Sequence, residues 1–141
     1  MSTIDTSEAP CTRTDVDPWT WQQPLGFSQA VVVEGGSTLV ELAGQGPVDA
    51  DGALVGEGDV AAQIDQAMDN VEEALRATGT TLADVVRLTI FTTDVDAFFA
   101  AYGTFVGRLA AGGCRPASSL VGVSRLAIPG MAVELEATAV R

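Results

Sequence analysis

Apolar and polar residues follow a regular pattern in several stretches of the chain, and each pattern predicts one element. From residue 59 to residue 79, apolar residues recur at steps of three and four, as they do along one face of an amphipathic helix. These apolar positions are Val60, Ile64, Ala67, Met68, Val71, Ala74 and Leu75. We expect Asp59 to cap the first amides of this helix and Gly79 to end it in the left-handed conformation.

A second helix is predicted for residues 94–113, with Asp94 as its cap. Its apolar face would carry Phe98, Tyr102, Phe105 and Leu109. Between the two helices, residues 84–94 have the side-chain alternation of a strand. On one side of this strand we expect Val86, Leu88 and Ile90, and on the other Arg87, Thr89 and Phe91.

The remaining predicted elements are strands and one long loop. Residues 28–36 and 38–44 are rich in β-forming residues and are separated by two glycines, so we expect them to pair. Residues 46–59 are dense in Gly, Asp and Pro, which predicts a loop, and lack the glycine spacing of a phosphate-binding motif. The last two strands are predicted at residues 117–126 and 132–140.

This order of elements predicts an α+β domain. Two helices cannot cover both faces of such a sheet, so we expect both helices to pack on one face. The opposite face would then be open and partly apolar, and self-association would bury it.

The first 24 residues form a predicted polar leader, and residues 25–141 form the domain. The leader is rich in Ser, Thr and Asp, but it contains two large apolar side chains, Trp19 and Trp21. One interpretation is that both indoles pack on the body of the domain. The other is that they cover a neighbouring subunit or the mouth of a pocket.

Composition excludes several classes of function. Nineteen acidic residues against seven basic ones give a net charge of -12, which disfavours binding to nucleic acid or to an anionic membrane surface. The chain has no histidine, so Ser-His-Asp and Cys-His catalysis and imidazole-based zinc sites are excluded. Cys11 and Cys114 have no metal-binding spacing, and we expect free thiols, no metal and no cofactor. Without a secretory signal or a spanning apolar run, we expect a cytoplasmic protein.

Two acidic residues in the last strand are candidates for chemistry. Glu134 and Glu136 are two residues apart, so their side chains share one face of the strand at roughly 7 Å. If Val133 and Leu135 pack beneath the helices, both carboxylates lie on the face that a partner would bury. There a carboxylate can serve as a general acid or base. Alternatively, one or both pair with an arginine across a subunit boundary, and the candidates are Arg87, Arg115 and Arg125.

Four segments together resemble the RidA (YjgF) family of small trimeric proteins over residues 25–141. They are AGQGPVDADGALVGEGDVAAQ, DNVEEALRATGTTLADVVRLTIFTTD, RPASSLVGVSRL and VELEATAVR. The resemblance implies a chorismate-mutase-like α+β fold with a mixed sheet and two helices on one face. It also implies a homotrimer whose sheets line a central barrel, with small-molecule pockets between subunits.

Members of the family with known activity hydrolyse reactive enamines and imines of the 2-aminoacrylate type to keto acids and ammonia. The family glutamate that helps to activate water corresponds to Glu134, and the arginine that binds the substrate carboxylate corresponds to Ser118. A serine cannot replace the two charge-assisted hydrogen bonds of a guanidinium. The other family positions fall at Phe27 (a tyrosine), Ala43 (a serine), Gly44, Tyr102 (an asparagine) and Leu120 (a cysteine), and Arg115 lies nearby.

These departures predict a pocket suited to a neutral or apolar small molecule, with Glu134 and Ser118 as its catalytic residues. The first hypothesis is acid–base chemistry by Glu134 on an imine, an enamine or a related neutral intermediate, as a hydrolase, tautomerase or cyclase. The alternative is a trimer that binds a small ligand or regulates without catalysis. A ribonuclease is disfavoured by the missing histidine and the negative charge.

Overall fold

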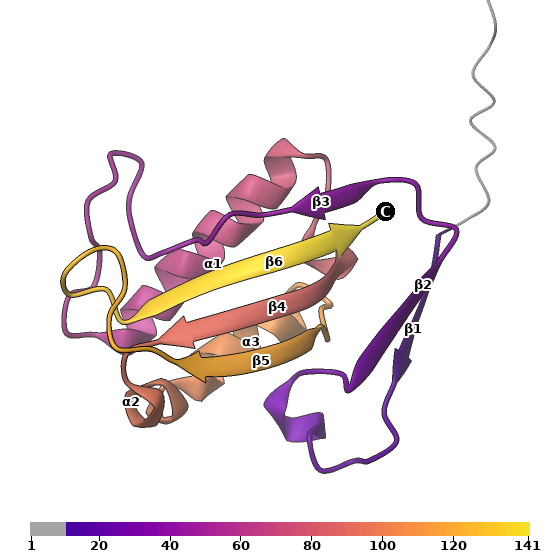
Figure 1. The fold of residues 1–141 in the computed structure, drawn as a ribbon, viewed down its shortest axis with the longest axis horizontal. Coiled ribbons are helices and arrows are strands. Elements are labelled where there is room, and N and C mark those ends of the chain that lie inside the picture. The colour runs from indigo at the N-terminus through magenta and orange to yellow at the C-terminus, as the bar shows by residue number, and fades with distance from the viewer. Residues whose placement is uncertain (1–10) are drawn as a thin grey trace, which may run out of the picture.

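The computed structural model describes residues 11–141, which form a four-stranded sheet with helices on one side and a two-stranded ribbon beside it (Figure 1). The strands are β1 (Thr12–Val16), β2 (Ala30–Glu34), β3 (Leu39–Glu41), β4 (Val85–Thr92), β5 (Ala117–Gly122) and β6 (Val133–Val140). The helices are α1 (Val60–Ala77), α2 (Val95–Ala100) and α3 (Tyr102–Ala111), with 3-10 turns η1 (Gln23–Leu25) and η2 (Leu82–Asp84). The large sheet has the order β3-β6-β4-β5, with β4 and β5 parallel and its other pairs antiparallel. The predicted α+β class and mixed sheet are confirmed.

Helix α1 begins and ends as its sequence predicts. The Asp59 carboxylate accepts a hydrogen bond of 3.1 Å from the backbone N–H of Ala62, and Gly79 adopts a φ of 79° just after the helix. Along the predicted stripe, the fully buried side chains are Ile64, Ala67, Met68, Val71 and Leu75. These residues pack against the sheet and form much of the hydrophobic core.

The predicted second helix is two helices. Asp94 caps α2 as expected, with a 3.0 Å hydrogen bond from Ala97 N–H, but the helix is interrupted at Ala101 before α3 begins. Phe98, Phe105 and Leu109 are still buried on one face. In Figure 1 the helices lie on the same side of the sheet, so the prediction that they share one face is confirmed.

One position of β4 differs from the predicted alternation. Leu88 and Ile90 are buried beneath the helices as expected, but Val85 is the buried residue at the start of the strand and Val86 is only half-buried. The pairing with β6 shifts register between Val85 and Arg87. This irregularity places one extra residue in β4, which reverses the side-chain alternation before it.

The N-terminal segment is not only a polar leader, because β1 lies within it. Strand β1 pairs antiparallel with β2, from Thr12 opposite Glu34 to Val16 opposite Ala30. The predicted pairing of residues 28–36 with residues 38–44 is therefore wrong, since β3 pairs with β6 in the other sheet. Arg13 attaches β1 to the domain through hydrogen bonds to three carbonyl oxygens, those of Ala83, Val85 and Arg115.

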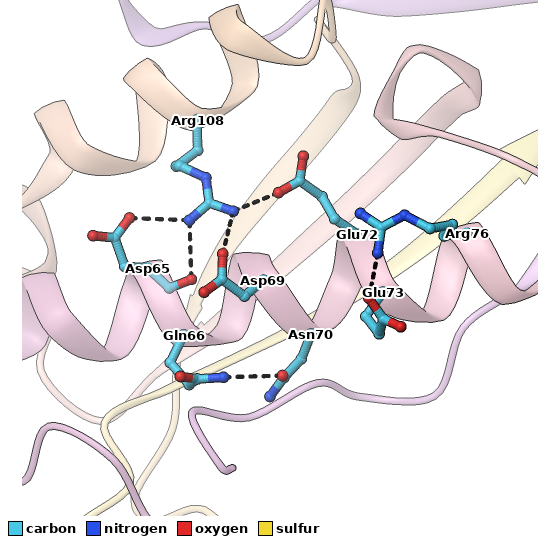
Figure 2. A network of polar contacts seen from close by, with 8 residues as sticks. All are labelled: Asp65, Gln66, Asp69, Asn70, Glu72, Glu73, Arg76 and Arg108. Carbon is cyan, nitrogen blue, oxygen red and sulfur yellow. Dashed lines mark hydrogen bonds and ion pairs between the residues drawn. The ribbon is translucent and has the colours of Figure 1, made fainter. Parts of the chain in front are cut away.

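An ionic network joins α3 to α1 on the outer surface (Figure 2). Arg108 of α3 reaches three carboxylates of α1, those of Asp65 at 3.1 Å, Asp69 at 2.7 Å and Glu72. Burial by itself would lower the pKa of the Arg108 guanidinium, but its hydrogen bonds to Glu72, Asp69 and Asp65 outweigh burial and raise it. This network accounts for four charges of the chain and holds the two long helices side by side.

Within residues 11–141, the helices are all too short or too polar to cross a membrane.

Candidate functional site

A β-bulge lies beside β6 where the chain leaves β3. Gln45 exchanges two backbone hydrogen bonds with Leu135, of 2.6 and 2.9 Å, whereas Leu42 donates to a carbonyl two residues farther along β6. Two residues, Ala43 and Gly44, therefore lie opposite a single residue of β6. Such bulges re-aim side chains and are frequent near active sites.

The bulge brings Gly44 against the carboxylate of Glu134. A Cβ atom at Gly44 would lie 2.0 Å from Oε1 of Glu134 and 2.8 Å from its Cδ, far inside contact distance. Gly44 does not have a positive φ, so its missing side chain serves this close approach rather than a turn. Gly44 and the Glu134 carboxylate therefore lie side by side in one chain, while their assignment to one functional site stays a prediction.

The two carboxylates of β6 lie on the open face, as predicted. Val133 and Leu135 are fully buried beneath them, whereas Glu134 is half-buried and Glu136 is exposed. Among residues 11–141, no hydrogen bond or ion pair occupies the Glu134 side chain. The carboxylate is thus partly shielded from water and available to a proton or a ligand.

Arg87 is the arginine that shares this open face. It lies on β4 and donates a hydrogen bond of 2.9 Å to the hydroxyl of Ser119 on β5. The β4 residues in register with the two glutamates are Phe91 for Glu134 and Thr89 for Glu136. An apolar ring, rather than a cation, is therefore the cross-strand neighbour of the Glu134 carboxylate.

Ser118 and Leu120 lie on the opposite face of the sheet. Strand β5 runs parallel to β4, with Ser118 in register with Leu88 and Leu120 in register with Ile90. Side chains of residues in register share one face, and Leu88 and Ile90 are buried beneath the helices. Ser118 and Leu120 are half-buried there because β5 is the edge strand of the sheet.

The other predicted pocket residues border this β5 edge. Ser28 bridges to Ala117, which places Phe27 beside the start of β5. Arg115 donates hydrogen bonds of 3.2 and 3.3 Å to the carbonyl oxygens of Gln23 and Phe27, so its guanidinium already has partners in the chain.

Tyr102 borders the same edge from α3. Its hydroxyl donates a hydrogen bond of 2.9 Å to the carbonyl oxygen of Leu25, which ties η1 to α3. Burial raises the pKa of this phenol above its ordinary value. Tyr102 therefore keeps its proton, which is already donated to Leu25, and its hydroxyl oxygen can only accept a hydrogen bond from a ligand.

The predicted site residues thus form two groups. Glu134, Gly44 and Ala43 lie at the bulge on the open face, whereas Ser118, Leu120, Phe27, Tyr102 and Arg115 lie at the β5 edge on the helix side. One chain cannot bring the two groups together, because the sheet separates them.

The family described as Endoribonuclease L-PSP matches residues 22–141. The crystal structure of YyfB from Yersinia pestis, a protein of unknown function of the conserved Rid protein family, is 38% identical with a TM-score of 0.83. That similarity covers 92% of this chain and 98% of YyfB. The chain belongs to the RidA family.

Two curated RidA relatives show how far the similarity extends. Protein DfrA from Myxococcus xanthus is 41% identical over 115 residues, which is 81% of this chain and 84% of DfrA. A 2-iminobutanoate/2-iminopropanoate deaminase from Salmonella typhimurium is 35% identical over 105 residues, which is 74% of this chain and 80% of the deaminase. The RidA fold predicted from the resemblance is confirmed, and imine deaminases are among the relatives.

No residue of either group lines the two larger cavities of the single RidA chain. One, of about 620 Å³, lies between the loop before α1 and α1 itself. Another, of about 420 Å³, lies at the loop between β5 and β6 and includes Arg125. The sequence prediction missed this second cavity because it extended the strand to residue 126, whereas β5 ends at Gly122 and Ser124, Arg125 and Leu126 lie in the loop. The only signal was an arginine and a serine inside a loop with Pro129 and Gly130.

Neither of the two tryptophans is buried by the body of this RidA domain in the single chain. Trp19 is 58% exposed and Trp21 is 63% exposed. Trp21 meets Phe27 edge to face, with ring centroids 6.1 Å apart. This contact places Trp21 next to a predicted pocket residue.

Proposed function

We propose that this chain is a RidA-type enzyme in which Glu134 catalyses the hydrolysis of an uncharged imine or enamine in a pocket between two copies. The contact between Gly44 and the Glu134 carboxylate carries this proposal. The backbone of the bulge fixes one side of the carboxylate, and no cation of the described residues neutralises it. A positioned, unpaired carboxylate that is partly shielded from water is suited to proton transfer.

The second copy supplies what one chain lacks. The open face of the sheet carries Glu134, and the β5 edge of a neighbouring copy would bring Ser118, Phe27 and Leu120 against it. Three copies arranged head to tail would form three such pockets in a closed ring. The half-buried state of Ser118 and the exposed Trp21 support an interface at this edge.

The proposed reaction needs only water and one carboxylate. Glu134 accepts a proton from water as the water oxygen forms a bond to the imine carbon, and the C=N π pair moves to nitrogen. Glu134 then returns the proton to nitrogen, which gives a carbinolamine. Glu134 next accepts the carbinolamine hydroxyl proton and passes it to the amino nitrogen, so the C–N bond breaks as the C=O bond forms and ammonia leaves a carbonyl product. Ser118 and the oxygen of Tyr102 would orient the substrate by hydrogen bonds.

The substrate class follows from the charges at the β5 edge. Ser118 stands where the family resemblance implies a carboxylate-binding arginine, and Arg115 is held by the carbonyls of Gln23 and Phe27. A substrate carboxylate would meet no free guanidinium among these residues. The relatives named 2-iminobutanoate/2-iminopropanoate deaminase act on substrates that carry a carboxylate, so this chain would prefer an imine without one.

Ammonia release from 2-iminopropanoate and from an uncharged ketimine tests this proposal. We expect the uncharged imine to be the better substrate, and we expect Glu134→Gln to lower its turnover by about 10² to 10⁴-fold. Glu136→Gln is the matched control, because it removes the same charge from the same strand without the Gly44 contact, and it should change turnover only about two-fold. Ser118→Arg should shift preference toward 2-iminopropanoate.

Two results would exclude catalysis by Glu134. One is that the wild-type protein hydrolyses neither imine, and the other is that Glu134→Gln hydrolyses at the wild-type rate. In the first case, saturable binding of the same ketimine without turnover would support the alternative of a non-catalytic trimer. Sedimentation at equilibrium must also give three chain masses, since a monomer cannot form the pocket.

A further inference from the structure

The cavity at the loop between β5 and β6 has the size and the lining of a small-molecule site. It measures about 420 Å³, within the range of pockets that enclose small organic ligands. Four of its lining side chains are apolar, namely Leu126, Ile128, Pro129 and Met131. Three others carry polar groups, namely Thr93, Ser124 and Arg125.

Arg125 differs from the other arginines of the chain in having no polar partner. All seven basic residues are arginines, and all seven lie within the described residues. Six of them donate hydrogen bonds to carboxylates, hydroxyls or carbonyls of the chain: Arg13, Arg76, Arg87, Arg108, Arg115 and Arg141. Among residues 11–141, no hydrogen bond or ion pair engages the Arg125 guanidinium. Arg125 is also exposed, so its unpaired guanidinium is accessible to a ligand from solution.

The hydroxyls beside Arg125 are also free to serve a ligand. The backbone N–H of Thr93 donates to Ala132, but in the described chain neither the Thr93 nor the Ser124 hydroxyl has a hydrogen bond. A guanidinium can bind both oxygens of a carboxylate, and hydroxyls beside it add neutral donors. Apolar walls on the same cavity favour a hydrocarbon group next to that carboxylate.

We propose that this cavity binds a small monocarboxylate with an apolar tail, with its carboxylate on Arg125 and its tail against Leu126, Ile128 and Met131. The cavity is lined by none of the residues of the proposed catalytic pocket. It does not rest on the proposed function, because binding here requires neither Glu134 nor imine chemistry.

A nearby carboxylate gives the proposal a second, opposite test. The Glu57 side chain packs against Gly130, which lines the cavity, and a Cβ at Gly130 would lie 3.3 Å from its Oε1. Glu57 makes no ion pair with Arg125 in the described chain. Its negative charge opposes a bound anion, so its removal should strengthen binding, whereas removal of Arg125 should weaken it.

The experiment is titration with 3-methylbutanoate, its uncharged analogue 3-methylbutanamide, and acetate, followed by backbone amide NMR. We expect 3-methylbutanoate to saturate and to shift the signals of Thr93, Ser124 and Met131. The amide lacks the charge and acetate lacks the tail, so each should bind at least about tenfold more weakly. Arg125→Gln should weaken 3-methylbutanoate binding at least about tenfold, and Glu57→Gln should strengthen it about two- to fivefold.

Arg76→Gln is the matched control, because Arg76 is an exposed arginine that pairs with Glu73 far from the loop. It changes the net charge as Arg125→Gln does and should leave the affinity within about twofold. The proposal is wrong if 3-methylbutanoate does not saturate, if the amide binds equally well, or if Arg125→Gln and Arg76→Gln have the same effect. Glu134→Gln should bind 3-methylbutanoate like the wild type, so failure here and failure of the catalytic proposal are separate outcomes.

Discussion

Substituting Gly44 by alanine should move the proposed catalytic carboxylate of Glu134 and leave the stability of the fold nearly unchanged. The new Cβ would lie 2.0 Å from Oε1 and 2.8 Å from Cδ of Glu134. Because ordinary contacts of a Cβ begin at 3.4 Å, the carboxylate must move by more than 1 Å. Its half-buried side chain can make that movement without unpacking Val133 or Leu135 beneath the strand.

The magnitudes differ widely between activity and stability. A misplacement of about 1 Å in a catalytic group costs roughly 10²-fold in rate. Replacing glycine where φ is not positive restricts the unfolded chain and stabilises by about 0.4–1 kcal/mol, which offsets part of the strain of moving Glu134. We therefore expect turnover of the uncharged ketimine to fall about 100-fold, with the free energy of unfolding changed by less than about 1 kcal/mol.

The assay pairs ammonia release with urea denaturation on the same preparations. Gly103→Ala is the control, because Gly103 lies in α3 and a methyl group added there would have no neighbouring atom within 4 Å. That variant should gain up to about 1 kcal/mol of stability through helix propensity and keep wild-type turnover. If Gly44→Ala keeps full activity, or if its activity falls only in proportion to unfolding, the Gly44 contact does not position Glu134 for catalysis.

Four further outcomes follow from other parts of the structure. Arg108→Leu should lower the free energy of unfolding by about 1–2 kcal/mol, since three partly exposed ion pairs are lost, and it should reduce the dependence of stability on salt. Burial raises the pKa of the Cys114 thiol from near 9 to about 12, so a thiol reagent at pH 8 should modify exposed Cys11 and spare Cys114. As the pH rises, the Cys114 thiol loses its proton in the unfolded chain before it does in the folded chain, where its pKa is raised. The free energy of unfolding should therefore fall between about pH 9 and about pH 12, and it should fall less steeply in Cys114→Ala. Trp21 contacts Phe27, so ligand binding should quench the fluorescence of Trp21, measured in Trp19→Phe, more than that of Trp19, measured in Trp21→Phe. Equal quenching in the two variants would contradict a role for Trp21 at the pocket.

The sequence predicts elements well where one face of the element meets the core. The stripe of α1, its Asp59 cap and the alternation around Leu88 are local signals that burial enforces. The sequence does not predict β1, because residues Thr12–Val16 have no apolar face and are held by pairing with β2 and by the hydrogen bonds of Arg13. Strand pairing between distant segments is not encoded locally, which is why the predicted partner of β3 is wrong.

The candidate site is predictable only in part for a similar reason. Glu134 and Gly44 can be linked from the sequence through the family resemblance, and their contact is visible within one chain. Ser118 and Glu134 are expected in one pocket between subunits, and the register of β5 with β4 places them on opposite faces of a single chain, so their meeting in that pocket stays a prediction. Arg125 is a candidate partner for a glutamate in a strand predicted over residues 117–126, and instead the strand ends at Gly122 and Arg125 lines a cavity in the following loop.

The placement of Glu134 and Ser118 on opposite faces of one sheet has a genetic consequence. In the proposed ring, each pocket takes its glutamate from one chain and its serine from the next. Two inactive proteins, one altered at Glu134 and one altered at the β5 edge, should therefore complement each other when unfolded and refolded together. Random mixing would rebuild about a quarter of the pockets from two intact halves. A protein that carries both lesions in the same chain should restore none.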